Sequence, residues 1–504
     1  MTRERRHSRR REETETISPE VAKITQPIHK YPILELLNPE AVQTIHEKSL
    51  EVLRDIGIAF LDDPEAQAIL TAHGVTVRDQ IAYFDPDLIM EYVGKAPAQF
   101  TQLARNPANN VQIGGNALTF APVYGPPFVH DLERGRREAT LADFHNFVKL
   151  AYQSPYLHHS GGTIVEPTDE PVPTRHLDMV FAHIKYSDKA FMGSVTSGLN
   201  AEDSVRMAEI LFGAEKIREM PALVSLINAS SPRRFDDRML GSMKVYAHAR
   251  QAMLISPFVL SGAMSPVTAA ATVVQMNAET LAGIAFTQMI NPGCPVIYGS
   301  FQATIDLQNG SPTFGTPEAQ IALAMSAQMA RFYNLPFRSG GMFTSSKIPD
   351  AQSAYESVLA MLPAINSRTN FILHAAGWLE GGLVAGYEKF VLDCEVLGMY
   401  HKYLEGVDLS DEAFAMDSIR EVPPGGHHLG TPHTMRHFRT AFYRAELFDA
   451  NSAEQWREMG SLDSAQRANA KYKKLLRQYE APALDEGVEE ALKDFMARRK
   501  RELR

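Results

Sequence analysis

The 504-residue chain is poor in cysteine and has no long uninterrupted apolar run. Its two cysteines, Cys294 and Cys394, exclude a disulfide framework and a cysteine metal site, and they fit the reducing cytoplasm in which we expect the protein. No apolar stretch reaches the ~18 uncharged residues of a membrane-spanning helix. The sequence therefore predicts a cytoplasmic protein without a membrane partner.

The chain also has no excess of positive charge, since the formal net charge at pH 7 is −10. Without a basic field the protein has no general attraction to nucleic acid, and we expect no nucleic-acid partner. The basic run RERRHSRRR at residues 3–11 is followed by Glu12, Glu13 and Glu15 and contains no apolar segment. It fits neither a secretory signal nor a transit peptide, and we predict a disordered tail over residues 1–29.

Several catalytic motifs are missing. The sequence has no GxxxxGK[ST], GxSxG or GxGxxG pattern, which excludes a P-loop, a nucleophile elbow and a tightly bound dinucleotide. HExxH is missing too, although His427, His428, His433 and His437 cluster near the C-terminus. We predict hydrogen-bonding or substrate-contacting roles for these histidines and no metal site.

Eight short apolar, glycine-punctuated runs alternate with amphipathic segments over residues 117–402. Most of the runs are continuously apolar, as parallel strands buried on both faces should be. Eight βα units over about 250 residues predict an α/β fold of the (β/α)8 TIM-barrel type, with a doubly wound open sheet as the alternative. The runs span residues 118–125, 158–167, 189–198, 222–230, 252–262, 295–303, 336–343 and 370–382.

Helical extensions flank the predicted barrel. Asn38-Pro39 and Asp85-Pro86 each combine an N-cap residue with proline at the first helical position, which predicts a helical cap over residues 30–116. Downstream, the loop PPGGHHLGTPHT at residues 423–434 precedes predicted helices over 436–448, 463–479 and 486–499. We expect residues 403–504 to pack on the barrel, because no flexible linker separates them from it.

The residues that end the predicted strands should form the site, because TIM-barrel active sites lie at the carboxyl ends of the strands. These residues are rich in aromatics and poor in free charge, which suits a cation held by cation–π contacts, above all a quaternary ammonium. Aromatic side chains at strand ends also cap barrel cores, so only the set as a whole carries the prediction. The set contains Tyr124, Phe128, Glu166, Asn228, Phe301, Gln302, Phe343, Trp378 and Glu380.

Four long segments make the chain resemble the trimethylamine:corrinoid methyltransferase family, in its form without pyrrolysine, from about residue 30 to about residue 500. They are TFAPVYGPPFVHDLERGRREATLADF at 119–144, the segments 260–300 and 335–357, and PPGGHHLGTPHTMRHFR at 423–439. The resemblance implies a barrel that passes a methyl group from a methylated amine to the cobalt of a separate corrinoid protein. The cobalamin-binding pattern DxHxxG is absent, so we expect no tightly bound cofactor and a corrinoid supplied by the partner.

The founding trimethylamine enzymes of this family carry pyrrolysine, whereas this sequence has only standard residues. The resemblance therefore implies a quaternary amine such as glycine betaine as the substrate, with trimethylamine as the alternative. We also expect a homo-oligomer.

Each candidate residue then has an expected role. Tyr124, Phe128, Phe301, Phe343 and Trp378 are candidates for the ammonium cage, and Glu166 or Glu380 for negative charge beside the nitrogen. The candidates for the carboxylate anchor are Arg338, His374, Asn228 and Gln302. We expect the loop that carries His427 and His433 to fold over the pocket and meet the corrinoid partner.

Two other classes of function remain open. A metal-dependent barrel hydrolase or lyase would need His158, His159, His433 and Glu166 to converge on one ion. A betaine-binding barrel without catalytic activity would bind the amine without transferring its methyl group.

Overall fold

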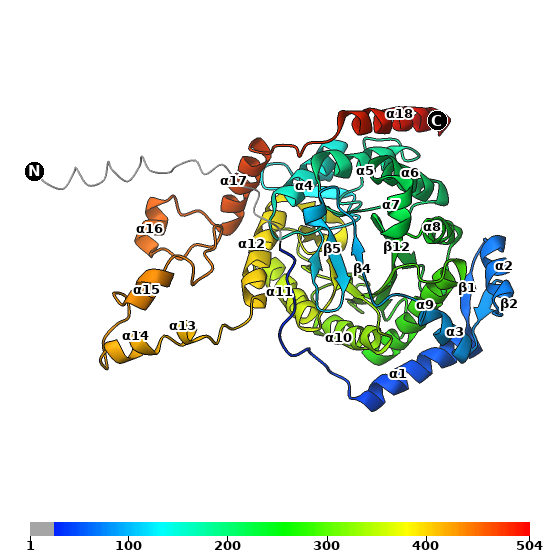
Figure 1. Cartoon of the computed structure of the whole chain (residues 1–504), viewed down its shortest axis with the longest axis horizontal. Coiled ribbons are helices and arrows are strands. Elements are labelled where there is room, and N and C mark those ends of the chain that lie inside the picture. Colours follow the sequence, from blue (N-terminus) through cyan, green and yellow to red (C-terminus); the bar gives the residue numbers. More distant parts are fainter. Residues whose placement is uncertain (1–24, 504) are drawn as a thin grey trace, which may run out of the picture.

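The computed structural model describes residues 25–503 and has a mixed α/β fold, which is the predicted class. Figure 1 shows the helices α4 to α12 arranged around the strands of the body. Of the predicted disordered tail, residues 1–24 lie outside the described residues.

The largest sheet has nine strands in the order β15-β14-β12-β13-β16-β17-β6, with β10 paired to β12 and to β9. All its pairs are parallel except β14 with β15. The strands are β6 (Thr119–Phe120), β9 (Phe191–Met192), β10 (Leu223–Ala229), β12 (Ala252–Ser261), β13 (Val296–Gly299), β14 (Phe301–Ile305), β15 (Pro312–Thr313), β16 (Phe337–Gly340) and β17 (Phe371–Leu373).

Seven of the eight predicted runs contain at least one of these strands, and the run at 158–167 does not. This run contributes an isolated parallel bridge between His159 and Ala190. The backbone N–H of His158 also donates to the carbonyl of Phe120 at 3.0 Å. Residues 158–160 therefore link β6 to the segment that leads into β9.

Helices follow most of the strands along the chain. Because α9 is apolar on all sides, it is buried between the sheet and the helices α1 and α3, as such a helix must be. The helices of the body are α4 (Leu141–Gln153), α5 (Arg175–Tyr186), α6 (Gly198–Phe212), α7 (Ala214–Glu219), α8 (Asp237–His248), α9 (Ala269–Ile290), α10 (Pro317–Phe332), α11 (Ala351–Asn366) and α12 (Tyr387–Leu404).

The N-terminal region contains the two helix starts that the sequence predicts. Asn38 caps α1 (Pro39–Glu51), which continues as a π-helical turn to Gly57, and Asp85 caps α3 (Pro86–Val93). This region also contains strands, which were not predicted. They are β1 (Ile58–Phe60), β2 (Thr76–Arg78) and β3 (Ile81–Tyr83), which form a sheet with β11 (Arg234–Phe235) in the order β11-β1-β3-β2. Helix α2 (Pro64–Ala72) lies between β1 and β2 in the chain.

A hairpin of β4 (Gln99–Gln102) and β5 (Val111–Gly114) covers the amino ends of the central strands. Its Gln102 side chain donates to the carbonyls of Phe191 and Ala222, which lie at the starts of β9 and β10. Phe100 and Ile113 of the hairpin join a buried apolar cluster with residues of the central strands. The hairpin leaves the carboxyl ends of these strands uncovered, so a functional site can lie there.

The remaining strands form a smaller sheet beside the carboxyl ends of the central strands. Its order is β18-β19-β7-β8, from β18 (Trp378–Leu379), β19 (Val384–Gly386), β7 (Phe128–Asp131) and β8 (Gly135–Glu138).

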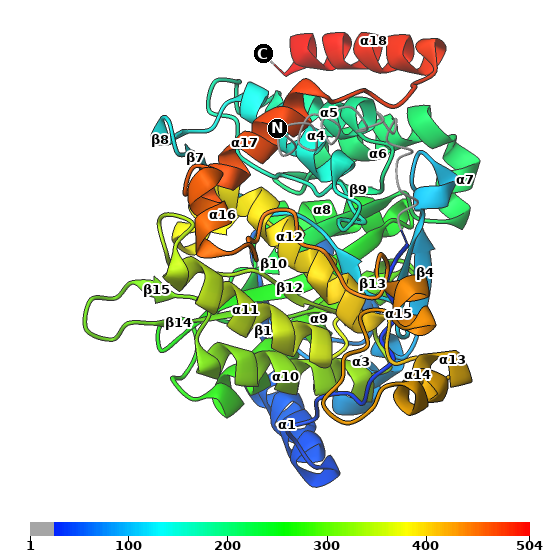
Figure 2. The ribbon, with the colours of Figure 1, turned by 90° about the vertical axis from the view of Figure 1, so that its left-hand side faces the viewer.

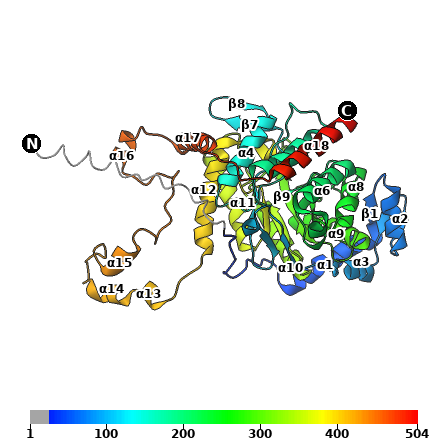
Figure 3. The same cartoon turned by 45° about the horizontal axis from the view of Figure 1, so that its top comes forward.

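The C-terminal helices fall into two groups. Figures 1 and 3 show α13 to α16 standing away from the body, whereas α17 and α18 lie against it. The helix predicted over 436–448 is wrong, because α15 ends at His437 and residues 439–448 are not helical; this exposed segment has little core against which a helix could pack. The helices are α13 (Asp411–Phe414), α14 (Met416–Glu421), α15 (Pro432–His437), α16 (Ala453–Glu458), α17 (Ser464–Arg477) and α18 (Glu486–Glu502).

No helix within residues 25–503 has both the length and the apolar character needed to cross a bilayer.

Candidate active site

The inner face of the central sheet changes from apolar to polar toward the carboxyl ends of its strands. Alternate residues of a strand project to the same face, so Asn228 follows Leu226 in β10 and Ser256 follows Leu254 in β12. Both leucines belong to the buried apolar cluster, and Asn228 is paired with Ser256 in the strand register. A polar layer therefore lies on top of an apolar floor.

Arg338 of β16 completes this polar layer. Its side chain is buried, with 1% of the residue exposed, and its Nη1 donates to Ser256 Oγ at 3.1 Å. Between β16 and β12 lies β13, which presents Gly299 opposite Arg338. A Cβ at Gly299 would lie 2.5 Å from the Cβ of Ser256, so glycine leaves the space through which the arginine reaches.

The guanidinium of Arg338 has no acidic partner in the described part of the chain, and its Nε has no hydrogen-bond acceptor. Burial lowers the pKa of Arg338 to about 9, since desolvation disfavours the charged form. A buried charge without a counter-ion is costly, and an anionic ligand group would supply the missing partner.

Five rings pack together beside Arg338. The centroid of Phe343 lies 4.8 Å from that of Trp378 and 5.1 Å from that of Phe301, and His374 lies 4.6 Å from Trp378. Phe314 joins them at 5.2 Å from Trp378. These rings come from loops and strands that are separated by up to 77 positions in the sequence. Four of them belong to residues that the sequence predicts for the site, namely Phe301, Phe343, His374 and Trp378.

The ring of Phe301 connects the cluster to the arginine and to solvent. The guanidinium carbon of Arg338 lies 5.3 Å from the Phe301 centroid. Phe301 and its neighbour Phe258 are only half-buried, and Asn228 is exposed, whereas Phe343 and Trp378 are buried. Phe301 is therefore the most solvent-accessible of the five rings.

His374 is held as a neutral imidazole. The backbone N–H of Tyr124 donates to its Nδ1 at 3.2 Å, so the ring proton resides on Nε2. Burial and the nearby charge of Arg338 lower the pKa of His374 well below 6.5. The predicted site residue Tyr124 is thereby joined to the cluster, and burial raises the pKa of its own phenol to about 12.

The two predicted carboxylates are both paired with arginine. Glu166 forms an ion pair with Arg175 at 2.5 Å, and burial raises its pKa despite that arginine. Glu380 forms an ion pair with Arg136 at 2.8 Å, and the guanidinium of Arg136 lies 3.7 Å from the ring centroid of the predicted Phe128. The two carboxylates therefore belong to ion pairs and Phe128 to a cation–π contact with Arg136, and none of the three is part of the ring cluster.

The other predicted residues lie elsewhere. Gln302 follows Phe301 in β14, so its side chain projects to the opposite face, where it donates to Ser261. His427 is exposed, and His433 lies in α15, which stands away from the body in Figure 1. The structure does not bring these three side chains to Arg338.

The residues required by the metal-dependent alternative do not converge. Buried His158 accepts from the backbone of Phe120, and buried His159 is bonded to Gln102 and to the backbone of Gly161, while His433 lies in α15. Within residues 25–503, Glu412, His433 and His437 are the group with metal-ligand spacing, and Glu412 is already bound by Arg436.

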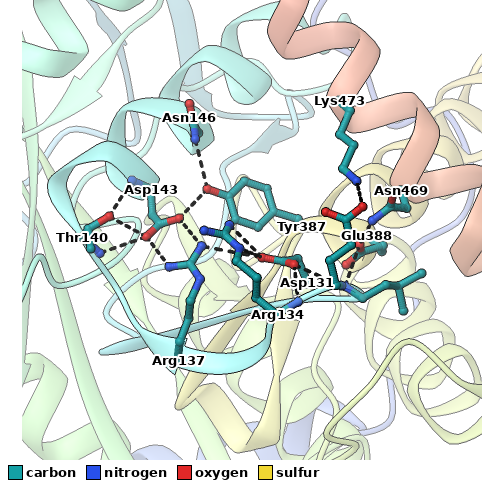
Figure 4. A network of polar contacts seen from close by, with 12 residues as sticks. Asp131, Arg134, Arg137, Thr140, Asp143, Asn146, Tyr387, Glu388, Asn469 and Lys473 are labelled. Atoms are coloured by element: carbon teal, nitrogen blue, oxygen red, sulfur yellow. Dashed lines mark hydrogen bonds and ion pairs between the residues drawn. The ribbon is translucent and has the colours of Figure 1, made fainter.

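A buried polar network fixes α12, which follows β19, against α4. Figure 4 shows Asp143 of α4 receiving hydrogen bonds from Arg137 at 2.6 Å, from Thr140 and from the hydroxyl of Tyr387 at 2.7 Å. Burial alone would raise the pKa of Asp143, but these hydrogen bonds outweigh it and lower the pKa to about 2. The network therefore joins Arg137 of β8 and Tyr387 of α12 to Asp143 of α4.

Sequence reasoning missed Ser256, Phe258 and Phe314. Ser256 and Phe258 lie inside a predicted strand, and only residues at strand ends were considered. The alternation Leu254, Ser256, Phe258 on one face is the signal that could have found them. Phe314 lies beyond β14, and no sequence pattern joins it to the ring cluster.

Fold and site together define an α/β protein with a buried arginine beside a cluster of aromatic rings. A family model described as trimethylamine methyltransferase (MTTB) matches residues 2–504. The chain belongs to this family, which confirms both the resemblance and the predicted class of methyltransferase.

Individual relatives agree with this assignment. Glycine betaine methyltransferase of Desulfitobacterium hafniense (strain Y51) is 43% identical over 94% of this chain and 98% of that protein. Proline betaine:corrinoid methyltransferase of Eubacterium limosum is 29% identical over 90% of this chain and 96% of its own length. Trimethylamine methyltransferase MttB of Desulfitobacterium hafniense (strain DSM 10664 / DCB-2) is 28% identical over 91% and 92%.

Among solved structures, monomethylamine methyltransferase of Methanosarcina barkeri matches with a TM-score of 0.47 and 11% identity. The match covers 88% of this chain and 93% of that one.

Proposed function

We propose that this protein transfers a methyl group from a quaternary amine of the glycine betaine type to the Co(I) of a separate corrinoid protein. The single observation that carries the choice of substrate is Arg338, a buried cation that lies beside a cluster of rings and has no acidic partner among residues 25–503. Such a pair of features suits a zwitterion, because it offers an anion-binding and a cation-binding group side by side.

In this proposal the carboxylate of the substrate binds Arg338. The carboxylate would accept hydrogen bonds from the guanidinium of Arg338, whose Nε has no other acceptor among the described residues. Nη1 of the same guanidinium is held by Ser256 Oγ. Asn228, which is adjacent in the strand register, and the Nε2–H of His374 complete the set of donors. A charge-assisted contact of this kind also removes the cost of the unpaired buried charge.

The trimethylammonium group lies against the rings. Phe301, with Phe343 and Trp378 behind it, offers π faces to a cation that has no proton to donate. We place Glu166 and Glu380 outside the contact set, because each is held by an arginine. Phe128, which stacks on Arg136, has the same supporting role.

The reaction requires the protein mainly to position the methyl group of the substrate. The corrinoid supplies a strongly nucleophilic Co(I), which forms the Co–CH3 bond while the electrons of the C–N bond return to nitrogen, and a neutral tertiary amine leaves. The residues of the site fix the methyl group toward the open carboxyl ends of the strands and exclude water from it. No general acid is needed, since the leaving nitrogen takes up no proton in this step.

The fold that presents this site is, we propose, a (β/α)8 barrel. The parallel pairs from β9 through β10, β12, β13, β16 and β17 to β6 form a continuous series. The bridge at His159 and the hydrogen bond from His158 to Phe120 support closure through residues 158–160. In such a barrel the hairpin β4–β5 covers the bottom, and Arg338 faces the mouth that a corrinoid protein can approach.

A panel of methylated amines with reduced cobalamin tests the proposal. Glycine betaine should yield methylcobalamin and dimethylglycine in equal amounts, whereas trimethylamine, which carries no permanent charge, should yield neither. Methylation of cobalt from trimethylamine alone would refute the choice of substrate. Binding of glycine betaine without any methylcobalamin would refute the enzymatic role and favour a binding protein.

A further inference from the structure

Residues 405–442, which we call the C-terminal arm, expose an unusual number of large apolar side chains. The arm leaves the body at the end of α12 and contains α13, α14 and α15, and Figures 1 and 3 show it standing clear of the other helices. Phe442 is the extreme case, with 86% of the residue exposed. The exposed apolar residues of the arm are Val407, Leu409, Phe414, Met416, Ile419, Leu429, Met435, Phe438 and Phe442.

Polar contacts within the arm give it a defined shape. Glu412 of α13 binds both Arg436 and His437 of α15, each at 2.8 Å. Ser418 of α14 hydrogen-bonds His428 at 2.9 Å and the hydroxyl of Thr431 at 3.0 Å. The arm is thus ordered by its polar groups while its apolar groups face outward, which is the arrangement of a surface that binds another chain.

A second apolar surface lies on α11 and α12. On α11 the residues Tyr355, Val358, Leu359 and Leu362 are all exposed, and their spacing places them on one side of the helix. On α12 the residues Leu392, Val396, Met399 and Tyr403 form a similar stripe, in which the last two are exposed. A groove lined by residues such as Ala354, Val358, Leu392 and Val396 runs between the two helices. We call this surface the α11–α12 face.

We propose that the arm of one chain docks on the α11–α12 face of a second copy, and that the exchange is reciprocal. In Figure 1 the arm, α12 and α11 all lie toward the left-hand side of the molecule, which faces the viewer in Figure 2, so the arm extends from the same side as the α11–α12 face. A two-fold axis would then place each arm on the other chain's face and cover all four apolar surfaces in one step. A second copy already carries an apolar surface for each of the two, whereas a partner of different sequence would need two such surfaces of its own.

The size of the arm surface is sufficient for a stable dimer. Large apolar side chains each contribute on the order of 100 Å² when buried, so nine of them correspond to roughly 900 Å². A standard interface buries ~800 Å² per partner. The arm alone reaches this value before the contribution of the α11–α12 face is added.

The test is the mass of the full-length chain by sedimentation equilibrium. We expect the wild-type chain to form a defined oligomer of at least two chains. Phe442→Asp and Tyr355→Asp should each raise the dissociation constant of this oligomer at least ~10-fold, because each would bury a carboxylate in the interface. Both residues are largely exposed in the single chain, at 86% and 77%, so neither change disturbs its folding. Val172→Asp is the matched control, because Val172 is 67% exposed and lies outside both surfaces.

Mixing the two variants tests the exchange itself. An F442D chain and a Y355D chain can form one intact contact between arm and face, so an equimolar mixture should associate more tightly than either variant alone. A wild-type monomer, or an oligomer that resists both substitutions, would overturn the proposal. An F442D variant that keeps its mass but no longer methylates a corrinoid protein would overturn it in favour of a corrinoid-docking arm. None of these masses depends on which amine is demethylated.

Discussion

Arg338 and Ser256 are joined across an intervening strand, with Nη1 of the arginine 3.1 Å from the serine Oγ. A neutral hydroxyl is the partner of this buried cation, and no carboxylate is paired with it in the part of the chain that the structure describes. The site is therefore organised around a buried positive charge whose counter-ion a ligand would supply.

Replacing Arg338 by methionine should weaken binding of the carboxylate end of the substrate without weakening binding of its ammonium end. The loss of a charge-assisted hydrogen bond of about 1.5–3 kcal/mol raises the dissociation constant of glycine betaine by roughly 10- to 150-fold. Tetramethylammonium has no carboxylate, and its affinity should stay the same or increase because a nearby cation is gone. Calorimetric titration of both ligands measures this. Arg331→Met, which removes an arginine bonded to Ser367 and Glu35, is the control and should change neither affinity.

Phe301→Leu should weaken cation binding more than apolar binding. The ring offers a π face that leucine lacks, and a desolvated cation–π contact is worth about 1–2 kcal/mol, or roughly 5- to 30-fold in affinity. The isostere 3,3-dimethylbutanoate, which has an uncharged carbon in place of the ammonium nitrogen, should bind wild type and variant within a small factor of each other. Equal losses for both ligands in competition assays would show that Phe301 contributes shape alone.

His374 should tolerate asparagine better than alanine. Its backbone has φ +63°, a region that asparagine adopts more readily than other residues with a side chain, and an amide oxygen can accept from Tyr124 N–H as Nδ1 does. We expect His374→Asn to keep the melting temperature near that of wild type, and His374→Ala to lower it. Scanning calorimetry of the two variants decides the point, since equal losses would show that neither φ nor the hydrogen bond matters.

Neutral His374 also has a consequence for pH dependence. Because burial and Arg338 hold its pKa well below 6.5, the imidazole does not titrate between pH 6 and 8. The affinity for glycine betaine should therefore be constant over that window. A change in affinity with a midpoint near pH 6.5 that disappears in His374→Asn would contradict a neutral His374.

Asp143→Asn should reduce stability in a pH-dependent way. The folded-state pKa of about 2 lies below the ordinary value of 3.8, so the carboxylate stabilises the fold above about pH 4, and this stabilisation is lost as the pH falls toward 2. We expect a loss of about 1–2 kcal/mol in the free energy of unfolding at pH 7, and a difference from wild type that shrinks between pH 4 and pH 2. Urea unfolding measures both. Asp417→Asn, at an exposed pair with Arg420, should have no effect at either pH.

The parts of the fold that the sequence predicts are those governed by local rules. Buried parallel strands appear in the sequence as continuous apolar runs. Asn38 and Asp85 mark the starts of helices because their side chains accept hydrogen bonds from the first backbone N–H groups. The predicted run at 158–167 makes only a bridge at His159, because Gly161 turns the chain with φ +93° shortly afterwards. That geometry depends on packing against Pro122 and Ile164, which no local pattern contains.

The site was predictable only in part for a similar reason. Strand-end position led to Phe301, Phe343, His374 and Trp378, which the fold does bring together. It also led to Glu166 and Glu380, whose pairing with Arg175 and with the distant Arg136 cannot be read from residue type. The arm illustrates the limit most clearly, since its apolar side chains suggest packing on the body, yet they remain exposed within one chain.

A crystal structure with glycine betaine bound is the most direct test of the central claim. We predict the carboxylate within ~3 Å of the Arg338 guanidinium nitrogens and the ammonium nitrogen within ~6 Å of the Phe301 centroid. A methyl group of that ammonium should face the open carboxyl ends of the strands. A betaine bound away from Arg338, or with its carboxylate toward the solvent-facing opening and its methyl groups against the arginine, would contradict the account.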